Sequence, residues 1–254
     1  MCLIALAWRA HADYPLVVAA NRDEFHERPS AAAQFWDDRP QILGGRDLEC
    51  MGTWLGLTRA GKFAGVTNVR DATDARTGAR SRGLLASAFL GNGVRAAEFT
   101  RQTAADGQAY RGFNLLVADR DELWWVSNRG DGPRRLAPGV YGLSNHLLDT
   151  PWPKVVRAKA RLEQVLEVAP ALDSLFELLA DDARAPDPEL PDTGVGLERE
   201  RLLSPTKIVS GTYGTRCSTA LTVSADGTVR FAERAFDREG REQDTVRYEF
   251  RLAR

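Results

Sequence analysis

The stretch MCLIALAWRAHADYPLVVAANRDE, residues 1–24, contains two short apolar runs, 2–8 and 14–20, joined by a polar, turn-like segment. Runs of this length that are almost continuously apolar are typical of strands covered on both faces. The second run leads directly into Asn21, Arg22, Asp23 and Glu24. Four polar residues at the end of a buried strand mark either the point where the chain reaches the surface or the position of a site.

The rest of the chain alternates groups of strands with pairs of helices. This order predicts the α+β class, with two mainly antiparallel sheets packed inside and helices outside, a four-layer αββα sandwich in one domain over residues 1–254. The predicted strands are 53–58, 62–68, 113–118, 123–127, 139–145, 217–223, 229–234 and 247–252, the helices are 81–90 (capped by Ser81), 94–105, 152–168 and 172–179, and the loops are 29–52, 70–82 and 184–197.

Composition excludes several classes of protein. The 254 residues are 43% hydrophobic and 27% charged, which is enough for a sizeable core and unlike a disordered chain. A net charge of -1 disfavours a nucleic-acid binder. No apolar run reaches the roughly 18–20 residues of a membrane span, and the start lacks the basic residues of a secretion signal. We therefore expect a soluble, cytoplasmic protein with no nucleic-acid partner and no integral membrane segment.

Cysteine usage agrees with an intracellular protein and singles out one residue. Cys2, Cys50 and Cys217 are an odd number without CxxC spacing, so we expect reduced thiols and neither a disulfide framework nor a metal site. Cys50 and Cys217 are expected to be inert, buried thiols. Cys2 differs, because a cysteine in second position is small enough for an aminopeptidase to remove Met1.

Removal of Met1 would place a thiol and an α-amine on the same residue. An α-amine has a reference pKa of about 7.7–8.0 and can act as a general base near neutral pH. The thiolate is an intrinsically strong nucleophile. Cys2 is therefore a candidate N-terminal nucleophile, and the alternative is a small apolar residue at the start of a strand.

Other polar residues stand at the ends of predicted strands. Asn68 and Asn145 carry amide groups that can stabilise an oxyanion without the cost of burying a charge. Asp23 could hold an amine or a guanidinium group, and Arg216 could act on the thiol or bind an acidic substrate. The alternative for each asparagine is a turn residue whose side chain satisfies the backbone.

A set of motifs follows one another along the chain: MCLI, AANRDEF, GTWLGLT, GKFAGVTN, GFNLLVAD, SNRG, YGLSN, LDTPWPK and YGTRCST followed by TVSADGTVRFAER. By this ordered set the chain is identified as a member of the NRDE family, also called the transport and Golgi organization protein 2 family. The resemblance covers essentially the whole chain and implies an N-terminal-nucleophile (Ntn) hydrolase-like fold. It also implies links to the cytosol, mitochondria and Golgi organisation, to haem trafficking and to acyl-CoA or lipid handling.

The cysteine branch of that fold includes bile-salt hydrolases and penicillin acylases. Carried over by position, the resemblance implies a nucleophile, an aspartate with an asparagine two residues before it, two oxyanion-side asparagines and a late arginine; in this sequence these are Cys2, Asp23 with Asn21, Asn68 with Asn145, and Arg216. That branch usually has an arginine three residues before the aspartate, where this chain has Ala20. Arg22 lies on the other side of Asn21 and is expected to point to the opposite face of the strand.

Two functions follow as expectations. The first is a hydrolase in which Cys2 attacks a small amide or thioester with no cofactor. The second is a non-catalytic carrier whose pocket, with Asn21, Arg22, Glu24 and His146 among its binding residues, holds haem or an acyl-CoA. For haem, His146 or Cys2 would be the axial ligand, and arginines would bind propionates or phosphates.

Overall fold

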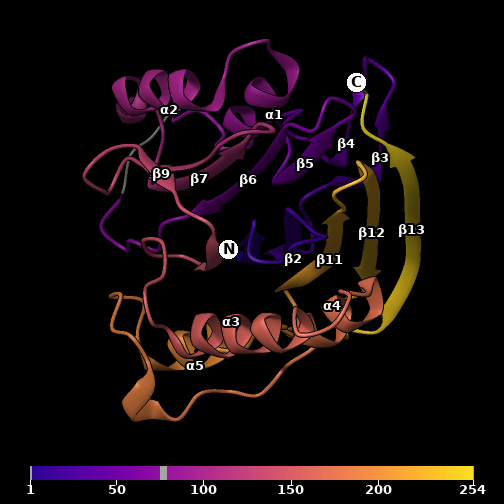
Figure 1. Ribbon diagram of the computed structural model, residues 1–254. Helices are drawn as coiled ribbons and strands as arrows, with labels where there is room; N and C mark the ends of the chain where they lie inside the picture. Colours follow the sequence, from indigo (N-terminus) through magenta and orange to yellow (C-terminus); the bar gives the residue numbers. More distant parts are fainter. Residues whose placement is uncertain (1, 75–78, 254) are drawn as a thin grey trace.

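The computed structural model describes residues 2–74 and 79–253, and they form two antiparallel sheets packed face to face with helices on both outer surfaces (Figure 1). This arrangement confirms the predicted α+β sandwich. The six-stranded sheet has the order β10 (Gly139–Leu143), β1 (Cys2–Trp8), β2 (Leu16–Phe25), β11 (Tyr213–Val223), β12 (Thr228–Phe236) and β13 (Glu242–Arg251). The seven-stranded sheet has the order β3 (Ser30–Trp36), β4 (Arg39–Asp47), β5 (Leu55–Thr58), β6 (Phe63–Asn68), β7 (Phe113–Ala118), β8 (Leu123–Ser127) and β9 (Arg134–Leu136).

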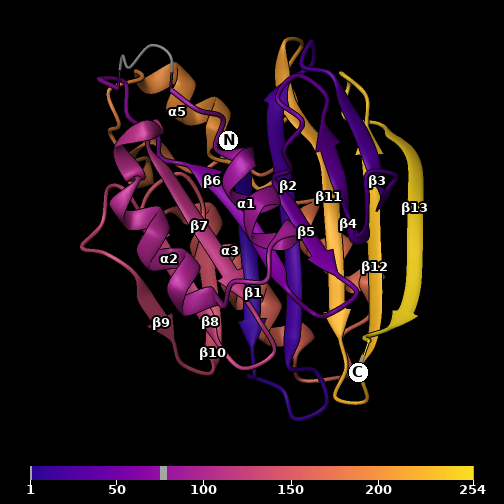
Figure 2. The same ribbon diagram turned by 90° about the horizontal axis from the view of Figure 1, so that it is seen from above.

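Each sheet is covered by its own pair of helices. Helices α1 (Gly83–Gly91) and α2 (Ala96–Ala105) pack on the seven-stranded sheet, over β5 to β8, as the view from above shows (Figure 2). Helices α3 (Pro153–Val165) and α4 (Leu172–Leu179) pack on the six-stranded sheet. The short 3-10 helices η1 (Gly107–Ala109) and η2 (Asp187–Glu189) and the helix α5 (Leu197–Leu203) lie in the connections.

The apolar run of β1 is continuous because both faces of the strand are buried. Ile4 and Leu6 point into the core between the two sheets. Leu3 and Ala5 point into the core beneath α3 and α4. Since successive side chains of a strand point to opposite faces, a strand between two cores needs an apolar residue at every position, as the sequence predicts for both runs.

The predicted loop over residues 29–52 is wrong, because β3 and β4 lie within it. Two of its glycines, Gly44 and Gly45, occupy positions of β4. A Cβ atom on Gly44 would lie 2.6 Å from the backbone oxygen of Leu55 in the neighbouring β5. The missing side chain thus permits the pairing of β4 with β5.

Other boundaries also differ from the predictions. The expected cap Ser81 does not cap α1, which begins after Arg82. The predicted loop 184–197 contains η2 and ends at α5, and the short edge strand β9 was not predicted. The predicted solvated loop 70–82 begins with the buried Arg70, and its residues 75–78 lie outside the described part of the chain.

No helix among the described residues is long and apolar enough to cross a membrane.

The core between the sheets should dominate stability. Phe63 is fully buried there, so we expect Phe63→Ala to lower the free energy of unfolding by about 3–5 kcal/mol through lost burial and a residual cavity. Val168, which is 67% exposed, provides the matched control, since Val168→Ala should change it by less than about 0.5 kcal/mol. Urea denaturation followed by tryptophan fluorescence measures both, and equal losses would contradict the assignment of this core.

Candidate functional site

The ends of β1, β2 and β6 meet at one side of the sandwich and enclose a cavity. In the antiparallel register Cys2 lies opposite Arg22, and both lie on the face of the sheet that points between the two sheets. The cavity has a volume of about 280 Å³. Its walls carry Cys2, Arg22, Asp23, Glu24, Arg28, Asp47, Cys50, Trp54, Val66, Asn68, Arg111 and residues 79–83.

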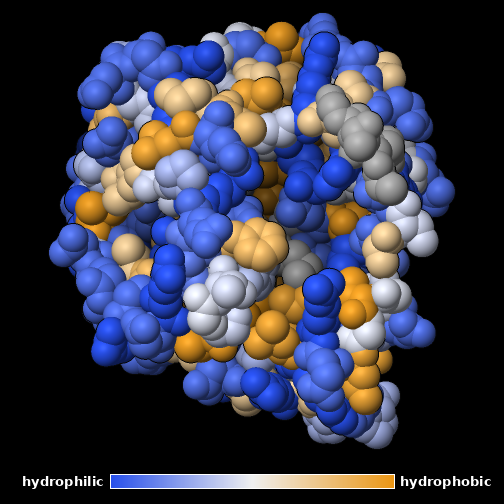
Figure 3. All heavy atoms as spheres, turned by 180° about the vertical axis from the view of Figure 1, so that it is seen from behind, coloured by the Kyte–Doolittle hydropathy of each residue, from blue (hydrophilic) through white to orange (hydrophobic). Residues whose placement is uncertain are grey.

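A second, larger cavity of about 580 Å³ adjoins the first. The two share five lining residues, Glu24, Arg28, Asn68, Arg82 and Arg111. The other walls of the second cavity are more apolar and come from β2, α5 and the start of β11: Phe25, Val195, Leu202, Leu203 and Tyr213, with Arg199, Ser210 and Thr212 among them. In Figure 3 the surface has a central hollow where hydrophilic and hydrophobic residues meet.

The side chain of Arg22 lies on the face of the sheet that also carries the Cys2 thiol, whereas the sequence suggested the opposite face. Ala20 and Arg22 are two residues apart and therefore share a face of the strand, with Ala20 in the core between the sheets. Arg22 is only 5% exposed and stacks on the ring of Trp54 at 4.3 Å. The Trp54 ring in turn lies over Gly45, where a Cβ atom would lie 2.1 Å from it. The stack fixes a buried cation on the cavity wall beside Cys2.

The Cys2 thiol is partly buried at the start of β1. Burial raises the pKa of the thiol above its ordinary value, and the nearby positive charge of Arg22 opposes that shift. Ser144 Oγ donates a hydrogen bond of 3.1 Å to the Cys2 carbonyl oxygen, which ties the end of β1 to the end of β10. With a raised pKa, the thiol needs a nearby base to become a nucleophile at neutral pH.

Asp23 points to the opposite face of β2, toward the layer of α3 and α4. Its Oδ1 accepts a 2.7 Å hydrogen bond from Thr215 Oγ1, and its carbonyl oxygen accepts one of 3.0 Å from the Tyr213 hydroxyl. Burial raises the pKa of the Asp23 carboxyl, while the charge of Lys154 and the Thr215 hydrogen bond lower it. Asp23 also lines the cavity, and its role in holding an amine or a guanidinium group remains a prediction.

The two asparagines predicted as oxyanion donors lie next to each other. Asn145 is fully buried, and its Nδ2 donates a hydrogen bond of 2.9 Å to the carbonyl oxygen of Asn68. Asn68 lines both cavities. Asn145 Oδ1 accepts a hydrogen bond from Ser144, so the pair joins the end of β6 to the end of β10. Their roles as oxyanion donors remain predictions.

The structure places four of the predicted residues outside the lining of both cavities: Asn145, Asn21, His146 and Arg216. Asn21 Nδ2 donates to two carbonyl oxygens and its Oδ1 accepts from Ser218, all beneath the helices. The exposed His146 contacts Thr150 and Trp152. Arg216 donates to carbonyl oxygens of the turn after β2, at residues 25, 26 and 28. Arg216 therefore fixes the turn that carries two wall residues.

Sequence reasoning missed a buried charged cluster behind the site. Lys154 is 1% exposed and donates a hydrogen bond of 3.0 Å to the Leu203 carbonyl oxygen, and burial lowers its pKa to about 8. The burial of Lys154 could have been predicted from the sequence, because Lys154, Ala158 and Leu162 recur every four residues on the buried face of α3. Beside it, Arg70 and Glu200 form an ion pair with side chains 5% and 3% exposed. That pair attaches α5 to the end of β6.

Cys50 was predicted to be buried but is partly exposed on the cavity wall, where its Sγ accepts a 3.5 Å hydrogen bond from Arg28. Cys217 is buried as predicted. Among residues 2–74 and 79–253, no group of three or more His, Cys, Asp or Glu residues is arranged to hold a metal ion.

Comparison with known proteins decides the family. The family model of "Transport and Golgi organisation 2" matches residues 1–238. The chain belongs to the transport and Golgi organisation 2 family. The family member of Homo sapiens, "Transport and Golgi organization protein 2 homolog", is 40% identical, with 94% of this chain and 93% of that protein covered. The Mus musculus member is 38% identical over the same shares.

A solved structure shares the fold of this family member. It is "Crystal Structure of the mutant C2A conjugated bile acid hydrolase from Clostridium perfringens", with a TM-score of 0.52 and 8% sequence identity over 98% of this chain and 97% of that chain. At that identity the likeness concerns the fold, and it agrees with the expected Ntn hydrolase-like architecture.

The buried ion pair gives a test of the wall formed by α5. We expect Arg70→Met to lower the free energy of unfolding by about 3–5 kcal/mol, because Glu200 would remain buried without its cation. The double variant Arg70→Met, Glu200→Gln should recover much of the loss. Thermal and urea denaturation measure both, and a double variant less stable than Arg70→Met would contradict this account.

Proposed function

We propose that this family member is a cysteine N-terminal-nucleophile hydrolase acting on a small amide or thioester. The observation that carries the proposal is that the Cys2 thiol lies on the wall of a cavity lined by several guanidinium groups and by the carboxamide of Asn68. Cavities in which a nucleophile meets groups able to stabilise negative charge are characteristic of acyl-transfer sites.

The proposed reaction begins after an aminopeptidase has removed Met1. The α-amine of Cys2 takes the thiol proton, and the thiolate attacks the carbonyl carbon and forms a C–S bond. The tetrahedral intermediate collapses with cleavage of the bond to the leaving amine or thiol, which receives the proton from the α-ammonium group. Water then attacks the acyl-enzyme, giving its proton to the amine, and the acid product and the Cys2 thiol are released.

The surrounding residues supply the electrostatics. The carboxamide of Asn68 would donate to the oxyanion, a contribution worth about 10²–10³ in turnover when one donor is removed. Asn145, which donates to the Asn68 carbonyl oxygen, would hold Asn68 in place. Asp23, fixed by Thr215, would orient the α-amine. The buried charge of Arg22 would favour the thiolate over the thiol.

The bile acid hydrolase of similar fold supports this proposal. It was solved as the mutant C2A, in which alanine replaces a cysteine in second position, and this matches the place of the nucleophile proposed here. The likeness in fold supports the correspondence of positions, and the groups that line the cavity around Cys2 supply the chemistry.

A carrier role would use the same two cavities without turnover. The arginines and the apolar wall of the second cavity suit an acyl-CoA better than haem. His146 lies outside the cavity lining and is bonded to Thr150, so the imidazole expected as an axial ligand does not fit, and Cys2 is the remaining candidate. Binding that persists unchanged in Cys2→Ala, together with absent covalent chemistry, would favour the carrier.

The decisive experiment is intact-protein mass spectrometry before and after treatment with p-nitrophenyl acetate as an acylating probe. We expect the purified protein to lack Met1 and to carry one adduct on Cys2. Cys2→Ala should abolish that adduct, and Cys50→Ala, which changes another thiol of the same cavity, should retain it. Retained Met1 with no adduct on Cys2 would refute the mechanism.

The pH dependence of alkylation tests the role of the α-amine. In protein with a residue kept before Cys2, burial raises the thiol pKa above 9.0, so the reaction with iodoacetamide should be slow at neutral pH and increase above pH 9. In processed protein the α-amine, with a reference pKa of about 7.7–8.0, should make the rate at pH 7.5 at least about tenfold higher. Peptide mapping measures both rates, and equal rates would exclude the amine as the base.

A further inference from the structure

The cavity walls carry far more positive charge than the chain as a whole. The two cavities together are lined by six arginines and three carboxylates, whereas the net charge of the whole chain is -1. One of these carboxylates, Asp47, is paired with Arg28 at 2.8 Å. An excess of cations inside a concavity attracts anions and raises their local concentration. The arginines are Arg22, Arg28, Arg80, Arg82, Arg111 and Arg199.

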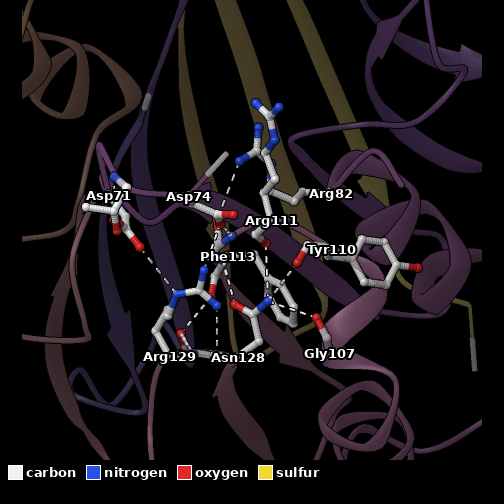
Figure 4. A network of polar contacts seen from close by, with 12 residues as sticks. Asp71, Asp74, Arg82, Gly107, Tyr110, Arg111, Phe113, Asn128 and Arg129 are labelled. Atoms are coloured by element: carbon white, nitrogen blue, oxygen red, sulfur yellow. Dashed lines mark hydrogen bonds and ion pairs between the residues drawn. The ribbon is translucent and has the colours of Figure 1, made fainter. Parts of the chain in front are cut away.

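Three of these arginines lie where the cavities join, since Arg28, Arg82 and Arg111 each line both the smaller cavity, which contains Cys2, and the larger one. Arg28 is paired with Asp47, and the other two are Arg82 and Arg111. Figure 4 shows their side chains extending to the same side, away from the polar network below them. A ligand that reaches Cys2 from the larger cavity must therefore pass them.

A dedicated network holds the backbone that carries Arg111. Asn128 Nδ2 donates to the carbonyl oxygens of Gly107, Tyr110 and Arg111 at 2.9, 3.1 and 3.2 Å, and its Oδ1 accepts from the Phe113 amide at 3.0 Å (Figure 4). Four hydrogen bonds from one side chain fix this turn before β7. The backbone position of Arg111 is therefore fixed by these hydrogen bonds.

The same turn is joined to the segment that carries Arg82. Asp74 accepts hydrogen bonds from the Gly112 amide at 2.9 Å and from Arg129 at 2.7 Å. Arg82 Nη1 donates a hydrogen bond of 3.5 Å to the Gly112 carbonyl oxygen, and within residues 2–74 and 79–253 this is the one hydrogen bond of the Arg82 guanidinium. Arg82 thus keeps donors available for a ligand.

Two guanidinium groups held near each other repel, and the positive charge of Arg111 contributes to a lowered pKa of Arg82. Burial lowers the pKa of Arg82, Arg111 lowers it further, and Glu24 on the shared wall opposes both. One carboxylate oxygen of Glu24 is already engaged, since Oε1 accepts a hydrogen bond of 2.9 Å from the backbone amide of the next residue, Phe25. A bound anion would relieve the repulsion, and guanidinium pairs bind carboxylate, sulfonate and phosphate groups through several charge-assisted hydrogen bonds.

We propose that Arg82 and Arg111 form an anion subsite, and that the substrate is an acyl compound carrying a carboxylate, sulfonate or phosphate group that binds between them. This inference rests on the proposed hydrolase function and names its substrate class. The anion lies at the junction of the cavities, the scissile carbonyl faces Cys2, and the larger cavity accommodates the remaining part of the molecule.

The first test compares thioesters that differ only in the charge of the leaving group: S-acetyl derivatives of mercaptoacetate, 2-mercaptoethanesulfonate, 2-mercaptoethyl phosphate and neutral 2-mercaptoethanol. We expect kcat/KM for the anionic esters to exceed that for the neutral ester by about ten- to hundredfold, the usual effect of hydrogen bonds to charged groups. The order among the three anions identifies the source of the charge.

Arginine variants assign the preference to these residues. Arg82→Gln and Arg111→Gln should each reduce it about tenfold, Arg82→Lys should retain part of it, and Arg101→Gln, at an exposed position of α2, should leave it unchanged. A merely structural role would lower kcat/KM for the neutral and anionic esters alike. That result, or no preference in the wild-type protein, would overturn the subsite.

A second readout separates failure of the subsite from failure of the hydrolase proposal. The rates at which iodoacetate and iodoacetamide alkylate Cys2 compare an anion with its neutral counterpart and require no turnover. We expect the ratio of iodoacetate to iodoacetamide rates to fall about tenfold in Arg82→Gln and Arg111→Gln and to fall with added salt. If thioesters are not hydrolysed but this ratio responds, the hydrolase proposal fails and the subsite stands; if the ratio is unchanged, the subsite fails.

Discussion

The register between β1 and β2 is the constraint on which the site depends. Seven consecutive pairs, from Cys2 with Arg22 to Trp8 with Leu16, fix the start of one strand against the end of the other. A shift by one residue would turn every side chain to the wrong core. Because both faces of β1 are buried, side-chain packing opposes such a shift, with Ile4 and Leu6 in one core and Leu3 and Ala5 in the other. The thiol and the guanidinium group are therefore adjacent as a result of core packing.

The same strands give the site two sides with different chemistry. The face between the sheets carries the thiol and Arg22, and the face beneath the helices carries Asp23 and its partners. Behind Asp23, the buried Lys154 supplies a positive charge that favours its ionised form. The two sides are still electrostatically linked, because the negative charge of Asp23 contributes to raising the pKa of the Cys2 thiol.

The fold class and the location of the site could be predicted from the sequence, because both follow from local pattern. Continuous apolar runs predicted the central strands, and the polar residues after them predicted the position of the candidate site. The strands β3 and β4 could not be predicted in this way, because their glycines serve a close approach that only the neighbouring strand explains. The orientation of Arg22 could have been deduced by counting two residues from Ala20. The arginines at positions 82 and 111 lie in connections, where no periodicity indicates the direction of a side chain.

The position of β1 between β2 and β10 has a consequence for biosynthesis. β2 follows β1 after a short turn, but β10 begins at residue 139. At a translation rate of about 5–20 residues per second, the outer edge of β1 stays unpaired for several seconds after it leaves the ribosome. The proposed mechanism requires trimming of the first methionine, and that interval would be its most open period. A chain that folded before it was trimmed would then hold its reactive group in an immature form.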